Sequence, residues 1–180
     1  MNSVDLIKGR RSVRRFDKKP VTRDMITKIV DVSRYAPSWK NTQTTRYIAI
    51  TDEAEKEKIA EECVMGFESN QKVIKGAPCL IIVLTVDERS GYERDGSFST
   101  SKGTHWQSFD AGIAAQTFCL SAYENGLGTV IMGIYDEEKI KEIIDIPSGS
   151  SVSALISLGY PAEEPRAPRR KEAEEILTFI

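Results

Sequence analysis

The chain has 180 residues, and its 25 lysines and arginines against 27 aspartates and glutamates give a formal net charge of −2. This length suits one domain with a core of its own, and a content of 40% hydrophobic and 29% charged residues is typical of a globular protein, which excludes a disordered chain. The near-neutral charge argues against a nucleic-acid-binding module, since such modules usually carry a strong basic excess.

The first half of the chain alternates between helical and strand patterns. In chain order it predicts a helix at 3–9, a helix at 22–36, a strand at 45–51, a helix at 53–65 and a strand at 79–85. Ser3 and Thr22 are the predicted caps of the first two helices, and Pro37 ends the second. The run CLIIVLT at 79–85 is continuously apolar, which is typical of a strand buried on both faces.

The second half begins with a polar segment, 87–103, whose glycines and serines predict a long mobile loop. It is followed by a helix at 108–125, a strand at 129–134, a helix at 136–144, a strand at 152–159 and a strand-like piece at 176–180. Gly126 is the predicted left-handed end of the first of these helices, and Asp136 is the predicted cap of the second. Because helices and strands do not alternate regularly, the pattern favours an α+β fold. The charged arm at 161–172 is expected to lie on the surface or to reach a second subunit.

The cysteines and the single histidine limit the chemistry. Cys63, Cys79 and Cys119 form no C-x-x-C pair, and His105 is the only histidine, so the sequence holds no zinc-ligand set and no metal is predicted. No base is identifiable beside His105, which disfavours a hydrolase. Widely spaced cysteines are typical of buried thiols in a reducing cytoplasm. No apolar run is long enough for a membrane span or a signal peptide, so we expect a cytoplasmic protein without a membrane partner.

Two basic clusters lie near the two ends of the chain. The first, RRSVRRF at 10–16, consists of Arg10, Arg11, Ser12, Arg14 and Arg15. The second consists of Arg166, Arg169, Arg170 and Lys171. The planar guanidinium group of arginine can donate two parallel hydrogen bonds to phosphate oxygens, and a serine hydroxyl adds a further donor. By itself the first cluster is either an anion site or a solvated basic stretch, and the second cluster favours a shared phosphate site.

Two loops offer groups that a flat ligand can use. In PSWKNTQ at 37–43, Ser38, Asn41 and Gln43 can pair with the edge of a heterocycle, although the same residues suit an ordinary loop. GLGTVIMG at 126–133 lacks the G-x-G-x-x-G fingerprint of dinucleotide-binding folds. Gly133 at the strand's end is suited to a ring lying against the backbone, and the alternative is a simple turn and strand.

Taken together and in order, these segments resemble the nitroreductase family of FMN-dependent oxidoreductases. The matching segments are RRSVRRF, APSWKNTQ, the stretch from Asn70 to Pro78, residues 109–143, ALISLGYPAEEP at 154–165 and RRK at 169–171. The resemblance covers nearly the whole chain. It implies one domain over residues 1–180, with a central, mostly antiparallel sheet flanked by helices, and an intertwined homodimer with FMN at the interface.

The resemblance also implies roles for individual residues. Arg10 and Ser12, with Arg11 beside them, hold the FMN phosphate together with a C-terminal arginine, best matched by Arg170 although Arg169 lies beside it. Arg14 reaches the N1/O2 side of the flavin ring and is the predicted catalytic residue, because its cation stabilises the reduced form. The residues implied to contact the ring from the same subunit are Asn70, Ile131, Met132 and Gly133. Those implied to come from the partner subunit are Pro37, Ser38, Trp39, Asn41 and Gln43.

Asp110 matches a family position and is interpreted as structural, because it opens the predicted helix. The chain is short for the family, so the 87–104 loop is expected to replace a helical insertion that covers the pocket in longer members. Trp39 stands where small residues are common and is expected to narrow the site.

The predicted activity is hydride transfer from NADH or NADPH through FMN to an electron-poor small molecule, such as a nitroaromatic compound or a quinone, by a ping-pong mechanism. Neither nucleic acid nor membrane is an expected partner. One alternative is a non-catalytic flavin or nucleotide carrier with the same fold. Another is an interaction module in which RRSVRRF binds RNA or a phosphoprotein.

Overall fold

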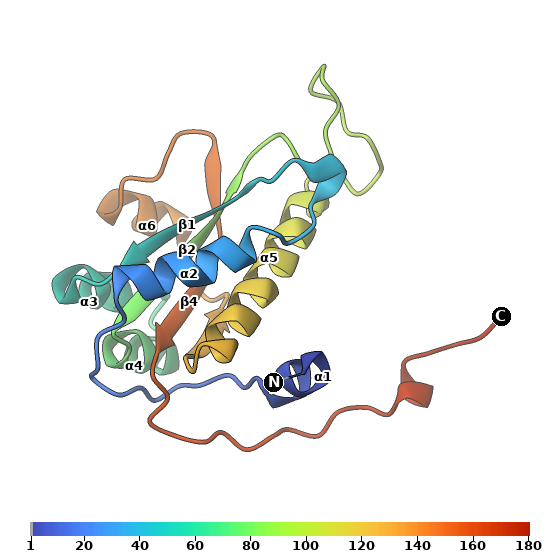
Figure 1. The fold of residues 1–180 in the computed structure, drawn as a ribbon. Coiled ribbons are helices and arrows are strands. Elements are labelled where there is room, and N and C mark those ends of the chain that lie inside the picture. Colours follow the sequence, from blue (N-terminus) through green and yellow to red (C-terminus); the bar gives the residue numbers. More distant parts are fainter. Residues whose placement is uncertain (1) are drawn as a thin grey trace.

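A single antiparallel sheet forms the centre of the protein. The computed structural model describes residues 2–180. The four strands are β1 (Thr45–Ile50), β2 (Cys79–Val86), β3 (Gly128–Met132) and β4 (Ser150–Gly159). Their order across the sheet is β1-β2-β4-β3, and each neighbouring pair is antiparallel. The predicted α+β class with a mostly antiparallel sheet is therefore confirmed (Figure 1).

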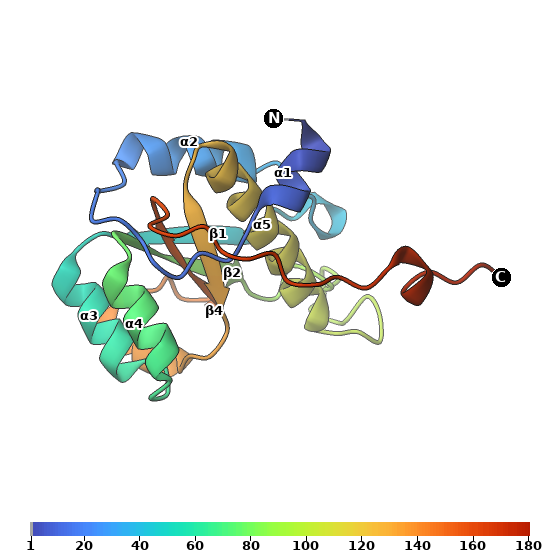
Figure 2. The ribbon, with the colours of Figure 1, turned by 90° about the horizontal axis from the view of Figure 1, so that it is seen from below.

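Helices cover both faces of this sheet. They are α1 (Ser3–Gly9), α2 (Arg23–Ser33), α3 (Glu53–Glu62), α4 (Glu68–Gly76), α5 (His105–Glu124) and α6 (Glu137–Ile143), with short 3-10 turns η1 (Trp39–Asn41) and η2 (Ala173–Glu175). One apolar cluster joins the sheet to α2 and α5, and a second joins it to α3, α4 and α6. Figure 2 shows the sheet between these two layers.

Strand β2 explains why the core has two halves. Side chains along a strand point alternately to opposite faces. Leu80, Ile82 and Leu84 accordingly belong to the cluster under α3, α4 and α6, whereas Ile81 and Val83 belong to the cluster under α2 and α5. A strand covered on both faces needs a continuous apolar run, and the run at 79–85 supplies it.

Several local predictions are confirmed. The Thr22 side chain accepts a hydrogen bond from the Met25 N–H at 3.2 Å, and Asp136 accepts one from the Lys139 N–H at 3.3 Å. Gly126 follows α5 with a φ of 76°, the left-handed conformation expected after a helix.

Other predictions at helix ends and at the C-terminus are wrong. Asn2, not Ser3, caps α1, because its side chain accepts from the Asp5 N–H at 2.9 Å. Asp110 does not open a helix, since α5 begins at His105. Residues 176–180 form no strand in this chain, because no sheet edge lies beside them to pair their backbone groups. Helix α4 was not predicted.

All three cysteines are free and buried, and burial raises their thiol pKa values, to about 11 for Cys63 and about 12 for Cys79. A raised pKa lowers the thiolate fraction at neutral pH, and the thiolate is the reactive form. We therefore expect no reaction of the native protein with a thiol reagent such as DTNB at roughly pH 8, and reaction of three thiols after unfolding in denaturant. Rapid labelling of any native cysteine would contradict this burial.

Candidate functional site

The segment after α1 lies along the edge strand β3. Ser12 pairs with Thr129 in a parallel bridge, and the Val13 N–H donates to the Thr129 carbonyl at 3.0 Å. This close approach needs a glycine at position 128, where an added Cβ would lie 2.7 Å from a methyl carbon of Val13. The pairing brings the basic segment beside the end of β3.

A cavity of about 280 Å³ opens where this segment, α4 and the end of β3 meet. Five residues that the resemblance assigns to one flavin ring line it together, namely Arg14, Asn70, Ile131, Met132 and Gly133. They come from three separate parts of the chain. Phe67, Ser69, Val73, Val130 and Ile134 complete the lining, and the sequence analysis had not selected these five.

The lining of this cavity combines a buried polar side chain, an open stretch of backbone and an exposed apolar side chain. Asn70 on α4 is only 8% exposed, and its side-chain N–H donates to the Ile134 carbonyl at 3.4 Å. A Cβ added at Gly133 would meet no atom within 4 Å, so the space beside this backbone is free. Ile131 is 45% exposed and offers an apolar surface at the same strand end. The combination suits a flat ring with polar edges.

Glu163 forms a salt bridge with only one arginine of the basic segment. Glu163 accepts the Arg14 backbone N–H at 3.1 Å and the Arg15 Nε at 2.8 Å, and these hydrogen bonds lower the pKa of its carboxyl. Arg15 is therefore paired with a carboxylate. Within residues 2–180, the Arg14 guanidinium donates only to the Ser12 carbonyl, at 3.3 Å, and the buried Nε of Arg10 has no hydrogen-bond partner. Within the described residues, the charges of Arg10, Arg11 and Arg14 are thus not paired with a carboxylate.

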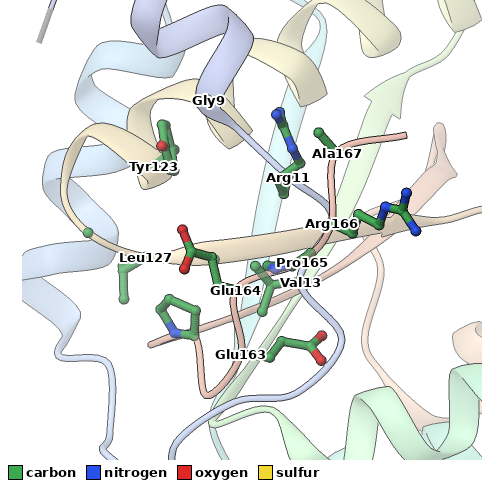
Figure 3. A pocket seen from close by; sticks show the side chains of 13 residues that line it. Gly9, Arg11, Val13, Tyr123, Leu127, Glu163, Glu164, Pro165, Arg166 and Ala167 are labelled. Carbon is green, nitrogen blue, oxygen red and sulfur yellow. The ribbon is translucent and has the colours of Figure 1, made fainter. Parts of the chain in front are cut away.

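Arg11 faces a different and larger cavity of about 680 Å³, which lies under the start of the C-terminal arm. Figure 3 shows Arg11 and Arg166 there, together with Glu163 and Glu164. Arg11 also donates to the carbonyl of Arg10 at 2.9 Å. Because carboxylates line this cavity beside the arginines, its charge is mixed and it favours no anion.

Arg170 lies in the exposed part of the arm, which extends away from the body of the protein (Figures 1 and 2). In the described part of the chain it forms no salt bridge or side-chain hydrogen bond, and neither does Arg169. The single chain therefore does not join either residue to Arg10 and Ser12.

The 37–43 segment lies elsewhere. Pro37, Ser38 and Trp39 line a separate cavity of about 280 Å³ at the start of α5, and this cavity shares no residue with the one beside Arg14. Asn41 and Gln43 are exposed. In Figure 1 the η1 turn and α4 lie at opposite ends of the molecule. One chain thus separates the two groups of residues that the resemblance assigns to one flavin.

Two residues that hold this arrangement have a role the sequence did not indicate. Glu163 joins the arm to the basic segment, and Asp110 accepts the Trp39 backbone N–H at 2.9 Å. Both are carboxylates distant in sequence from their donors, and no spacing signal points to them.

Residues 2–180 contain no group of three or more potential ligands among histidine, cysteine, aspartate and glutamate that could hold a metal ion. Over the same residues, no helix is both long enough and apolar enough to cross a membrane.

Comparison with known proteins identifies relatives for most of the chain. The model of the Nitroreductase family matches residues 7–160. A protein of Methanothermobacter thermautotrophicus named "Putative NADH dehydrogenase/NAD(P)H nitroreductase" is 32% identical over 169 residues, which are 92% of this chain and 80% of that protein.

Solved structures are similar as well. A nitroreductase family protein from Clostridium novyi NT has a TM-score of 0.78 and 28% identity, covering 93% of this chain and 89% of that one. An "FMN-dependent Nitroreductase" from Clostridium difficile R20291 has a TM-score of 0.78 and 26% identity, covering 98% of both chains.

Proposed function

Since this chain belongs to the nitroreductase family, we propose that it is an FMN-dependent oxidoreductase that takes electrons from NADH or NADPH. The observation that carries this proposal is the single cavity lined by Arg14, Asn70, Ile131, Met132 and Gly133. The names of its relatives support it, because they include an NAD(P)H nitroreductase and an FMN-dependent nitroreductase.

Two observations support a fit between the residues present and FMN. The buried Nε of Arg10 lacks a partner in the described residues, and a phosphate oxygen would satisfy it. The open space beside Gly133 would take a flat ring against the backbone. When bound, FMN supplies the hydride chemistry, and the protein supplies binding, orientation and electrostatics.

Each group of residues in the site then has a role in binding FMN or in the reaction. Arg10 and Ser12 bind the phosphate, and Arg170, which the arm holds away from them in the single chain, joins them when two chains assemble. Arg14 places a cation at the N1/O2 side of the ring and favours its reduced, negatively charged form. Asn70 and the backbone at the end of β3 hold the ring's polar edges. The donor and an electron-poor acceptor, such as a nitroaromatic compound or a quinone, occupy the same cavity in turn, which gives ping-pong kinetics.

The second half of the site comes from a second copy of the chain. None of the five residues Pro37, Ser38, Trp39, Asn41 and Gln43 lines the Arg14 cavity within one chain, and the η1 turn lies at the opposite end of the molecule from α4 (Figure 1). The arm also ends in exposed apolar side chains, including Ile176, Leu177 and Phe179, which a partner subunit would bury. We expect a dimeric mass in solution, and a monomer that retained FMN tightly would contradict the shared site. We also propose a cytoplasmic location, because the free thiols suit a reducing compartment.

The first test is the visible spectrum of the purified protein with NADH and NADPH added in turn without oxygen. Flavin bands that bleach, followed by recovery with a nitroaromatic compound or a quinone, support the proposal. Bands that neither donor bleaches would favour a flavin carrier. A protein that stays colourless after FMN is added would overturn the assignment.

Replacing Arg14 with methionine is expected to lower the two-electron midpoint potential of bound FMN by about 30 mV or more, which corresponds to about a tenfold loss of preference for the reduced form. The reason is the loss of a cation that is not paired with a carboxylate. The potential is measured by equilibration with redox dyes. Arg15→Met is the matched control, because Arg15 pairs with Glu163 and lies outside the cavity. An unchanged potential in Arg14→Met would remove the electronic role of Arg14.

A further inference from the structure

The 38–43 segment adopts a backbone conformation that its residues do not favour. Lys40, Asn41 and Gln43 have φ values of 44°, 56° and 50°, in the left-handed region. Asparagine tolerates this region, but lysine and glutamine rarely adopt it. Such a conformation persists only where its surroundings hold it, and it is concentrated at sites with a function. The contacts around the segment therefore identify what holds it.

A buried carboxylate anchors the start of the segment to α5. Asp110 on α5 is 3% exposed, and its Oδ2 accepts the backbone N–H of Trp39 at 2.9 Å. The hydroxyl of Ser90, which is fully buried, donates to the same oxygen. No salt bridge to Asp110 occurs within residues 2–180, so these two donors are the groups that stabilise its charge. The carboxylate thus ties α5, the 87–104 loop and the 38–43 segment together.

Trp106, at the start of α5, packs on the same segment and joins it to the 87–104 loop. The rings of Trp39 and Trp106 have centroids 4.6 Å apart. The loop lies on the Trp106 ring, since a Cβ added at Gly91 would lie 2.9 Å from a ring carbon of Trp106. Lys40 also pairs with Glu93 of the loop at 3.1 Å, but both side chains are exposed, and such a pair contributes little. The loop therefore supports the segment through Trp106 and through the Ser90–Asp110 hydrogen bond more than through this ion pair.

We infer that Asp110 is a positioning residue, which with Ser90 holds Trp39 and the strained segment in the one conformation that can contact a second copy. The consequence for FMN rests on the proposed function, in which this segment completes the partner's flavin site. Within one chain no residue of the 87–104 loop lines the cavity beside Arg14, and the loop supports the other half of the site. If the segment adopts the conformation that completes the flavin site in only a fraction of the molecules, the apparent Kd for FMN equals the intrinsic Kd divided by that fraction.

The test uses the two tryptophans of the chain, Trp39 and Trp106, which pack on each other. Near-UV circular dichroism in the tryptophan band reports on this pair without any ligand, and fluorescence titration gives the Kd for FMN. Asp110→Ala is expected to lose most of the tryptophan signal and to raise the Kd about tenfold. Asp110→Asn keeps an acceptor oxygen and is expected to retain most of both. Ser121→Ala, a change of another buried polar residue on α5, is the control and is expected to alter neither.

The outcomes separate the two claims. An unchanged tryptophan signal in Asp110→Ala would overturn the positioning role. A lost signal with an unchanged Kd would show that the segment does not complete the flavin site, and would overturn the consequence for FMN. Absence of FMN binding in the unmodified protein would refute the proposed function, while the dichroism still decides the positioning role. If Asp110→Ala does not fold, Ser90→Ala is expected to give a partial loss of signal, and no loss there would overturn the inference.

Discussion

Replacing Arg10 with alanine is expected to weaken FMN binding by about 100-fold. Hydrogen bonds to charged groups contribute roughly 1.5–3 kcal/mol each, and an arginine can make two to one phosphate, so a loss of about 3 kcal/mol is expected. The buried and unpartnered Nε of Arg10 is the observation behind this expectation. The measurement is a titration of the apoprotein with FMN, followed by quenching of flavin fluorescence.

Arg15→Ala is the matched control for this experiment. It removes an arginine from the same segment, but one whose charge already pairs with Glu163 at 2.8 Å and whose side chain is 76% exposed. We expect its Kd for FMN to change by less than about threefold, since exposed ion pairs contribute little. Arg10→Lys keeps the charge without the planar fork and is expected to lie between the two. Equal Kd values for Arg10→Ala and the unmodified protein would remove Arg10 from the phosphate site.

Replacing Gly133 with valine is expected to raise the Kd for FMN by about thirtyfold or more while leaving the stability of the apoprotein nearly unchanged. The branched side chain would project into space that the ring is proposed to occupy, and overpacking a fitted contact costs about 2 kcal/mol. In the protein alone nothing lies within 4 Å of the added Cβ, so folding meets no clash. The two quantities are measured by flavin titration and by thermal unfolding of the apoprotein.

The control for this substitution is Gly76→Val at the end of α4, where an added Cβ also meets nothing within 4 Å. Gly76 does not line the cavity beside Arg14, so this variant should bind FMN as the unmodified protein does. If Gly133→Val bound FMN normally, the ring would have to lie away from the end of β3.

Elements governed by neighbouring residues could be predicted from the sequence. Strand β2 followed from a continuous apolar run, and the caps Thr22 and Asp136 followed from side chains that bond to backbone N–H groups three residues away. These signals are local, so they persist whatever the rest of the chain does. Helix α4 was not predicted although its buried residues Asn70, Val73 and Ile74 share one face, because it is short and Phe67 at its start supplies no capping side chain.

The residues of the candidate site came from a resemblance, and the sequence could not say how they meet. Arg14, Asn70 and Gly133 are far apart along the chain, and they share a cavity only because the first segment pairs with β3 and α4 packs beside its end. The same packing places the η1 turn, which begins at Trp39, at the opposite end of the molecule from α4 (Figure 1). Asp110 was interpreted as structural because it opens a helix, and that ground was wrong, since α5 begins at His105. Its partners Trp39 and Ser90 lie 71 and 20 residues away, so the sequence could not indicate them.

The sequence by itself thus determined the α+β class, the buried strands and the caps Thr22 and Asp136, and its resemblance to a family selected the residues proposed to bind FMN. The tertiary structure decided which arginines keep an unpaired charge. The C-terminal arm pairs with the basic segment between Pro161 and Phe16, and this pairing places Glu163 beside Arg15. The tertiary structure also decided that one chain holds only half of the proposed site. The physical reason is that capping and burial patterns act within a turn or a strand, whereas the sharing of a cavity depends on contacts between segments that only the packed core brings together.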